Sequence, residues 1–236
     1  RCKKLECRVT AVLVAAGSST RMGFDKLSLD LGGETVLERS VRAFDECPEV
    51  DELVIVTGAS GENAQRAAAR CKKPVRLVKG GSTRAESARS GVAAAHGKLV
   101  AVHDAARPFV SQSVIADTIA AAARCGAAAP AVPVKDTVKV AAADGAVLET
   151  LDRSTLRAVQ TPQVFDADLI KGALTVAAAK ALPITDDCSA IELMGVKVKA
   201  VEGDPNNIKL TTPNDVMLAE AILRDRGDEY ADRTWL

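Results

Sequence analysis

The sequence has few aromatic residues and no excess of charge of either sign. Only 3% of its 236 residues are aromatic, and 31 basic side chains balance 31 acidic ones. A general nucleic-acid-binding protein needs surplus positive charge for the phosphates, and a single-strand binder needs aromatic rings on which bases stack. We therefore expect no nucleic-acid partner.

Closely spaced cysteines and histidines are also missing. The six cysteines include no C-x-x-C pair, and the two histidines are His96 and His103. Structural zinc sites need closely spaced ligands, so none is expected. Scattered cysteines in a chain long enough for a large core are typical of the reducing cytoplasm, where we expect this protein. No apolar run in the sequence approaches the ~20 residues that span a bilayer, so no membrane association is expected.

Short apolar runs instead alternate with alanine-rich stretches. Strands are predicted at residues 9–15, 53–57, 75–78, 99–103 and 129–134, and helices at 35–47, 63–71, 84–96 and 113–125. Near-continuous apolar strands separated by helices indicate a mostly parallel sheet covered on both faces. Further helices are predicted at 168–180 and 186–194, a strand at 196–201, and a last helix with Thr212 as N-cap and Pro213 at its first position. We expect one α/β domain over residues 1–236.

The alternation breaks at residues 135–153. Two strand-like segments, 136–140 and 146–151, flank Asp144-Gly145, a pair that favours a tight hairpin turn. A hairpin inserted into a parallel α/β domain cannot share the register of its sheet. We expect it to project as a β-arm and to bind a partner through its exposed face.

Candidate ligand-binding residues follow the first predicted strand. Ligands of open α/β sheets bind beyond the carboxyl ends of the strands. The small residues from Ala15 to Ser18 allow backbone N–H groups to approach phosphates, and Arg21 and Lys26 add positive charge. The spacing matches neither a P-loop nor a dinucleotide fingerprint. A phosphate-binding loop and a plain turn with two solvated cations remain as alternatives.

The third predicted strand is followed by Gly80-Gly81-Ser82-Thr83-Arg84. Thr83 and Glu86 have the spacing of a capping box, which explains those two residues structurally. Two glycines and Arg84 at a helix N-terminus suit an anion or a nucleotide base that approaches closely.

Asp104 directly follows the fourth predicted strand, and Arg107 lies three residues further on. A carboxylate in this position commonly serves Mg²⁺, while an Asp104–Arg107 ion pair is the structural alternative. His103 is better explained as a packed, hydrogen-bonded imidazole than as a catalyst. Arg153 and Lys209 each resemble surface charges when taken alone, but a chain of zero net charge can hold a phosphate-rich ligand only with cations gathered locally.

Eight motifs taken together resemble one family, the 2-C-methyl-D-erythritol 4-phosphate cytidylyltransferases of the non-mevalonate isoprenoid pathway. Between Val12 and Asp215 they are, in chain order, VLVAAGSSTRMG, GGSTRAES, HDAARPFV, PVKDTVK, LDRSTL, QTPQVF, ITDDCSA and EGDPNNIKLTTPND. The first of them marks nucleotidyltransferases broadly, whereas the set is more specific.

The resemblance implies a Rossmann-like α/β fold, a homodimer joined through the β-arm, CTP as co-substrate, and Mg²⁺ or another divalent cation. The implied CTP-binding residues are Ala15, Ala16, Gly17, Ser18, Gly81, Ser82, Arg84, Ser87 and Ala105. The implied catalytic residues are Arg21, Lys26, Arg153 and Lys209. The sugar-alcohol phosphate would be held by Asp104, Arg107, Thr137, Thr185 and Lys209, with Arg153 supplied by the other subunit and Asp104 also bound to the metal.

Two residues depart from the family pattern. Asp25 precedes Lys26 where the family often has proline, and Ser82 follows the glycine pair where an acidic residue is frequent. The nearest rival is a ribitol-5-phosphate cytidylyltransferase or another sugar-phosphate nucleotidyltransferase. A rival of another class is a nucleotide-binding dimer without catalytic activity.

Overall fold

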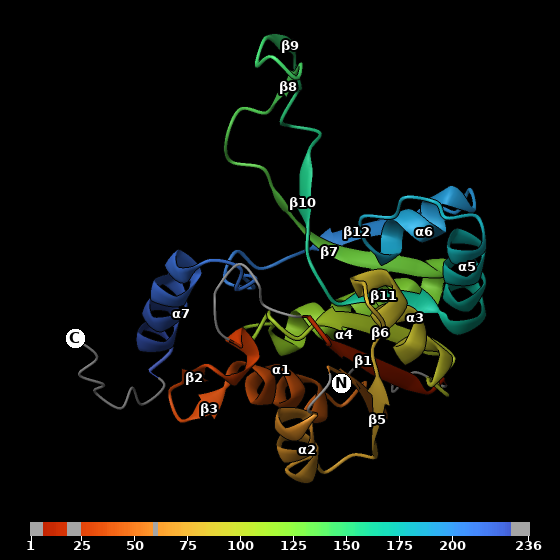
Figure 1. Cartoon of the computed structure of the whole chain (residues 1–236), viewed down its shortest axis with the longest axis vertical. Helices are drawn as coiled ribbons and strands as arrows, with labels where there is room; N and C mark the ends of the chain where they lie inside the picture. Colours follow the sequence, from red (N-terminus) through yellow and green to blue (C-terminus); the bar gives the residue numbers. More distant parts are fainter. Residues whose placement is uncertain (1–6, 18–24, 59–60, 228–236) are drawn as a thin grey trace.

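An eight-stranded, mostly parallel sheet forms the centre of the computed structural model, which describes residues 7–17, 25–58 and 61–227 (Figure 1). The strand order is β10 (Arg157–Val159), β7 (Ala127–Pro133), β11 (Gln163–Asp166), β6 (Leu99–Asp104), β1 (Val9–Ala15), β4 (Glu52–Thr57) and β5 (Val75–Lys79), while β12 (Lys199–Glu202) pairs with β7. Neighbouring strands from β6 to β5 are parallel, and β10 and β11 run antiparallel to their neighbours. The predicted mostly parallel sheet is confirmed.

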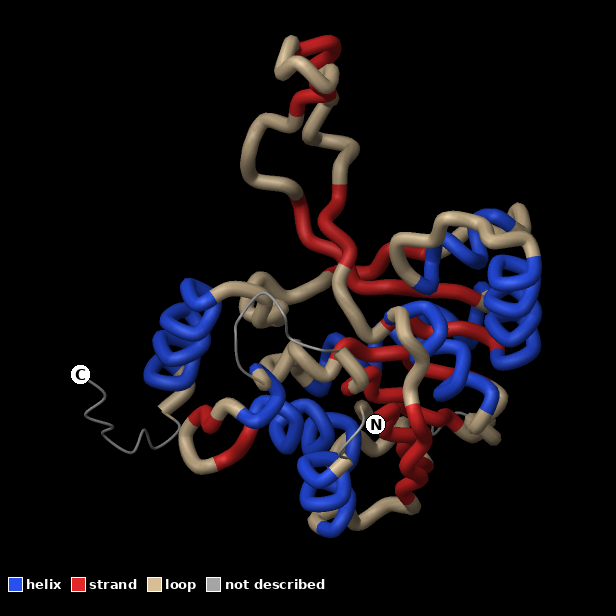
Figure 2. The backbone as a smooth tube through the Cα atoms, viewed as in Figure 1, coloured by secondary structure: helices blue, strands red, loops and turns tan. Residues whose placement is uncertain are grey.

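Of the seven helices in the described residues, the first six cover both faces of this sheet, as predicted, and the last lies to one side of it (Figure 1 and Figure 2). They are α1 (Val36–Asp45), α2 (Glu62–Ala69), α3 (Arg84–Ala93), α4 (Gln112–Cys125), α5 (Ala167–Ala179), α6 (Asp187–Leu193) and α7 (Pro213–Asp225). Helices α1, α2, α4 and α7 contribute to one hydrophobic core, and α3, α5 and α6 contribute to the other.

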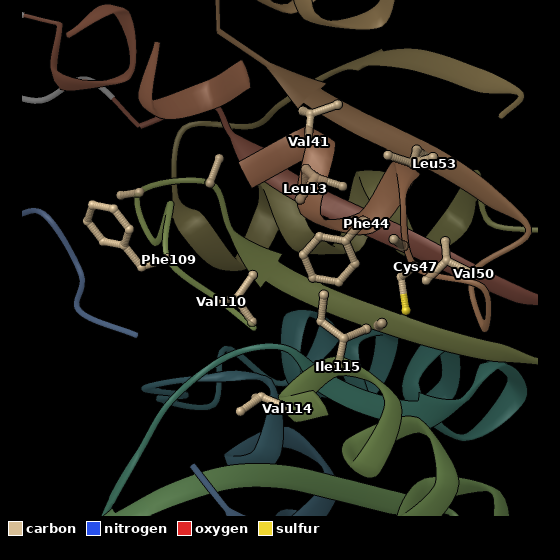
Figure 3. Close-up of a cluster of buried hydrophobic side chains, with 14 of the residues drawn as sticks. Leu13, Val41, Phe44, Cys47, Val50, Leu53, Phe109, Val110, Val114 and Ile115 are labelled. Atoms are coloured by element: carbon tan, nitrogen blue, oxygen red, sulfur yellow. The ribbon is translucent and has the colours of Figure 1, made fainter. Parts of the chain in front are cut away.

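Side chains of the central strands alternate between these two cores. In β1, Ala11 and Leu13 belong to the core of α1 and α4, whereas Val12 belongs to the core of α3 and α5. Figure 3 shows the first of these cores, where Leu13 and Phe44 are packed together with Ile115 of α4. This two-sided burial explains why the strands appear in the sequence as continuous apolar runs.

Several short elements were not predicted. They are the antiparallel strands β10 and β11, the pair β2 (Asp30–Leu31) and β3 (Glu34–Thr35), and the 3₁₀ helix η1 (Lys26–Ser28). Helix α3 also ends at Ala93, three residues before the predicted end. Thr212 is the N-cap of α7 and Pro213 its first residue, as predicted.

The hairpin predicted after β7 projects from the body of the molecule (Figure 1). Its antiparallel strands β8 (Lys139–Ala141) and β9 (Val147–Thr150) pair with each other outside the main sheet. The side chains of Val147 and Leu148 at its tip are 60% and 67% exposed. The hairpin therefore presents an apolar surface to its surroundings.

Within the part of the chain that the structure describes, no helix is both long and apolar enough to span a bilayer.

Candidate active site

A cavity of about 510 Å³ lies where β1 and β6 end. It is bounded by segments that the sequence separates widely, from the end of β1 to the loop after β12. Nine residues predicted for the site line it, namely Ala16, Gly17, Lys26, Gly81, Ser82, Arg84, Ser87, Asp104 and Lys209. The carboxyl ends of the parallel strands thus gather the predicted residues as expected.

Asp104, the last residue of β6, binds two cations at the cavity wall. Its Oδ1 accepts a hydrogen bond from Nε of Arg84 at 2.9 Å, and its Oδ2 accepts one from Nζ of Lys209 at 2.6 Å. Burial alone would raise the pKa of this carboxyl, but Arg84 and Lys209 hold it well below its usual range. Asp104 is therefore ionised at neutral pH. The alternative of a simple Asp104–Arg107 ion pair is wrong.

Arg84, the first residue of α3, lies between two carboxylates. Besides Asp104, it binds Asp187, whose Oδ2 accepts a hydrogen bond from Nη2 of Arg84 at 2.9 Å. Burial alone would lower the pKa of Arg84, but these two carboxylates raise it above its ordinary value. Sequence reasoning missed Asp187, which is 103 positions from Arg84 in the chain.

Lys26 and Arg107 both bind the segment that precedes α7. Nζ of Lys26 donates to the carbonyl oxygen of Leu210 at 3.0 Å, so Lys26 lies next to the segment that carries Lys209. Nη1 of Arg107 donates to the carbonyl oxygen of Asn207 at 2.7 Å. Burial lowers the pKa of Arg107. Arg107 is not part of the cavity lining, whereas Lys26 is.

The glycine pair allows the loop after β5 to approach the end of β1. A Cβ atom on Gly80 would lie 2.3 Å from Cβ of Ala16, closer than any real contact. Ser87 is buried beneath this loop, and its hydroxyl accepts a hydrogen bond from the N–H of Gly81 at 3.2 Å. Glycine at position 80 is thus required by the close packing of two cavity loops.

The predicted capping box at the start of α3 is only half formed. The Thr83 hydroxyl accepts a hydrogen bond from the N–H of Glu86 at 3.1 Å. The Glu86 carboxylate, however, accepts hydrogen bonds from both the N–H and the hydroxyl of Ser82, each at 2.7 Å. Ser82 is therefore bound to the first turn of α3.

The remaining predicted residues lie outside the cavity lining or outside the described residues. Ala105 is buried beside it, and Ala15 precedes Ala16 at the end of β1. Thr137 and Arg153 belong to the projecting arm, where Nη1 of Arg153 donates to the carbonyl oxygen of Lys135 at 2.7 Å. Thr185 precedes α6, and its N–H binds the hydroxyl of Ser189. Ser18 and Arg21 lie outside the described residues.

The described residues form no metal site of their own. They contain no group of three or more His, Cys, Asp or Glu side chains able to hold a metal ion. Each oxygen of Asp104 accepts one hydrogen bond, and a carboxylate oxygen has two lone pairs. Asp104 can therefore contribute one oxygen to a metal ion whose other ligands are water and phosphate.

Comparisons with known proteins agree with one another. The model of the family described as IspD, 2-C-methyl-D-erythritol 4-phosphate cytidylyltransferase, matches residues 9–225. The chain is 45% identical to the 2-C-methyl-D-erythritol 4-phosphate cytidylyltransferase of Symbiobacterium thermophilum, over 94% of this chain and 95% of that protein. It is 46% identical to the bifunctional enzyme IspD/IspF of Anaeromyxobacter dehalogenans over 92% of its residues, but spans only 57% of that protein. The crystal structure of 4-diphosphocytidyl-2C-methyl-D-erythritol synthase from Anaerococcus prevotii is similar with a TM-score of 0.84 and 33% identity, covering 92% of this chain and 96% of that one.

Proposed function

The chain belongs to the 2-C-methyl-D-erythritol 4-phosphate cytidylyltransferase family, and we propose that the cavity around Asp104 is where it transfers CMP from CTP to 2-C-methyl-D-erythritol 4-phosphate. One observation carries this assignment. Lys26, Arg84 and Lys209 come from three separate segments and line a single cavity. In a chain of zero net charge, such a local gathering of cations suits two phosphate-bearing substrates.

The reaction needs no nucleophile from the protein. An oxygen of the sugar phosphate attacks the α-phosphorus of CTP, and the bond from that phosphorus to the bridging oxygen of the β-phosphate breaks, so pyrophosphate leaves. The second pKa of a phosphomonoester is about 6, so the attacking oxygen is already largely ionised at neutral pH. Catalysis then consists of aligning two anions and stabilising the charge that gathers between them.

We assign some of these residues to CTP and others to the sugar phosphate, according to the loop or strand end on which each lies. The loops at Ala16-Gly17 and Gly81, with Ser87 beneath, are proposed to hold CTP, since small residues and free space allow its close approach. Lys209 and Asp104 are proposed to hold the sugar phosphate, together with Arg107, Thr137 and Thr185. Lys26, which lines the same cavity, is proposed to stabilise the transition state, as is Arg21.

Mg²⁺ is proposed to enter with the triphosphate. A cation of this kind keeps most of its waters and is held by one or two carboxylates and by substrate phosphates. One lone pair remains on each oxygen of Asp104, so this residue fits as the protein ligand. When bound, the ion would neutralise part of the triphosphate charge.

A homodimer is proposed to complete the site. The arm carries Thr137 and Arg153, neither of which lines the cavity of its own subunit, and Val147 and Leu148 of the arm are exposed. Pairing two arms would cover these apolar side chains and bring Arg153 to the other subunit's cavity.

The cytoplasm is the proposed compartment. All five described cysteines are free thiols, in keeping with a reducing environment.

The test is pyrophosphate release from CTP with either 2-C-methyl-D-erythritol 4-phosphate or ribitol 5-phosphate as acceptor. We expect release with Mg²⁺ and the first acceptor and little with the second. A preference for ribitol 5-phosphate would replace the acceptor named here. Binding of CTP without pyrophosphate release in the presence of either acceptor would indicate the non-catalytic nucleotide-binding dimer.

A further inference from the structure

Asp187 is the most deeply buried member of the charged cluster beside the cavity. Its side chain has 0% exposure, compared with 11% for Asp104 and 29% for Arg84. A fully buried carboxylate cannot contact a substrate in the cavity. Within the described residues, Arg84 is the hydrogen-bond partner of the Asp187 side chain, so we expect Asp187 to act on the reaction through Arg84.

The backbone that carries Asp187 is held firmly against the sheet. The N–H of Cys188 donates to Oε1 of Gln163 at 3.0 Å, and Nε2 of the same glutamine donates to Oδ2 of Asp186 at 2.7 Å. The carboxylate of Asp186 also caps α6 by accepting from the N–H of Ser189 at 2.9 Å. Helix α6 is thereby fixed to β11, and Asp187 presents its carboxylate from a defined position.

Stability alone does not explain this carboxylate. Its Oδ1 atom is buried and has no hydrogen-bond partner among the described residues. Burial raises the pKa of Asp187, and Arg84 opposes that shift. A buried charge with an unsatisfied oxygen costs stability, and apolar residues often replace such buried pairs without loss. What the Asp187 carboxylate supplies is a fixed position for the Arg84 guanidinium.

That cation is fixed in a specific orientation. Nε of Arg84 is bound to Asp104 and Nη2 to Asp187, each at 2.9 Å. Within the described residues, Nη1 has no hydrogen-bond or ion-pair partner, and Arg84 lines the cavity. Nη1 is thus the nitrogen of Arg84 that can donate both of its N–H groups to an anionic ligand. Without the charge on Asp187, Arg84 is free to bind Asp104 through two nitrogens. It would then compete with Lys209 for the Asp104 carboxylate, and Nη1 would no longer face the cavity.

We propose that Asp187 is a positioning residue that holds the Arg84 guanidinium so that its remaining nitrogen binds the phosphates of CTP. This role rests on the proposed function, because it names the nucleotide of that reaction as the anion that Arg84 meets.

The test is a double-mutant cycle on pyrophosphate release. Asp187→Asn keeps the shape of the side chain and removes its charge, so we expect the KM for CTP to rise about tenfold with a much smaller change in kcat. In an Arg84→Lys background, the same substitution should have little further effect, because the group through which Asp187 acts is already altered. Glu192→Gln, an exposed change in the same helix, is the matched control and should leave both constants unchanged.

An unchanged KM for CTP in Asp187→Asn, or equal losses in both backgrounds, would overturn the proposal. Absence of a cooperative unfolding transition in Asp187→Asn would also overturn it, by assigning the carboxylate a purely structural role. If Arg84→Lys does not fold, Arg84→Gln takes its place in the cycle. If the wild-type protein releases no pyrophosphate, the proposed function is wrong, and the same cycle measured on CTP binding by calorimetry tests Asp187 independently.

Discussion

The hydroxyl oxygen of Thr161 lies 3.0 Å from Nδ1 of the fully buried His103. The same oxygen accepts a hydrogen bond from the N–H of Asp104 at 3.1 Å, so its own proton is available to Nδ1. Nε2 of His103 then carries the imidazole proton and donates it to the carbonyl oxygen of Arg107 at 3.1 Å. The predicted packed imidazole is confirmed, and it supports the backbone of two substrate-binding candidates.

The stability of the protein should fall in mild acid because of His103. Burial lowers its pKa to about 4 from the ordinary value of 6.5. Between these two values the unfolded chain binds a proton that the folded protein does not, so folding loses about 3 kcal/mol as pH falls from above 6.5 to 4. Urea unfolding of wild type and His103→Gln across this range measures the effect. The variant should be less stable at neutral pH but should lack this contribution to the slope.

The exposed histidine gives the control for that experiment. The side chain of His96 is 56% exposed, and His96→Gln should retain most of the wild-type pH dependence. Equal slopes for wild type and His103→Gln would contradict the assignment.

Lys26→Ala should lower kcat by on the order of a hundredfold, with a smaller change in the KM for CTP. The physical reason is that the lysine is proposed to meet charge that develops in the transition state. Steady-state kinetics with varied CTP measures both constants. Lys197→Ala, at an exposed position outside the cavity lining, is the matched control. A near-normal kcat with a raised KM would assign Lys26 to ground-state binding.

Two inactive variants should restore activity when mixed. If Arg153 acts on the other subunit's cavity, a dimer of one Arg153→Ala and one Lys26→Ala subunit contains one intact site. After random exchange of equal amounts, about a quarter of all sites should be intact. Pyrophosphate release before and after exchange measures this recovery, with each variant alone as the baseline. Exchanged heterodimers without recovered activity would remove the assignment of Arg153 to the neighbouring subunit.

Two glycines in helices should respond oppositely to alanine. A Cβ atom on Gly91 of α3 would lie 2.3 Å from Cγ1 of Val12 and 2.7 Å from Cγ2 of Val56, whereas one on Gly172 of α5 would meet nothing within 4 Å. Gly91→Ala should therefore destabilise the fold by roughly 1–3 kcal/mol through overpacking. Gly172→Ala should stabilise it by about 0.5–1 kcal/mol through helix propensity. Chemical denaturation measures both, and a stable Gly91→Ala protein would contradict the close packing of α3 on the sheet.

The central strands could be predicted because each is buried on both faces and so forms an apolar run. Strands β10 and β11 could not, since they have three and four residues and acquire their character by pairing with β7. Their antiparallel direction depends on the path of the whole chain, which local patterns do not contain.

Some residues of the candidate site could likewise be predicted from the sequence, and others could not. Asp104 and the glycine loop could be predicted because they follow strands at the edge where ligands bind. Asp186 and Asp187 are adjacent and chemically identical, and both stand at the start of a helix. Only the tertiary structure shows that the first caps α6 while the second is buried against Arg84.

The base of the β-arm is closed by the sheet itself. Strand β7 leads into the arm, and the chain returns through β10, which pairs with β7 opposite Pro133 at Arg157. Insertions or deletions between these two paired residues would change how far the hairpin reaches without shifting the register of any core strand. If two arms join subunits as proposed, the spacing of those subunits can thus change without altering the loops that line the cavity of each one.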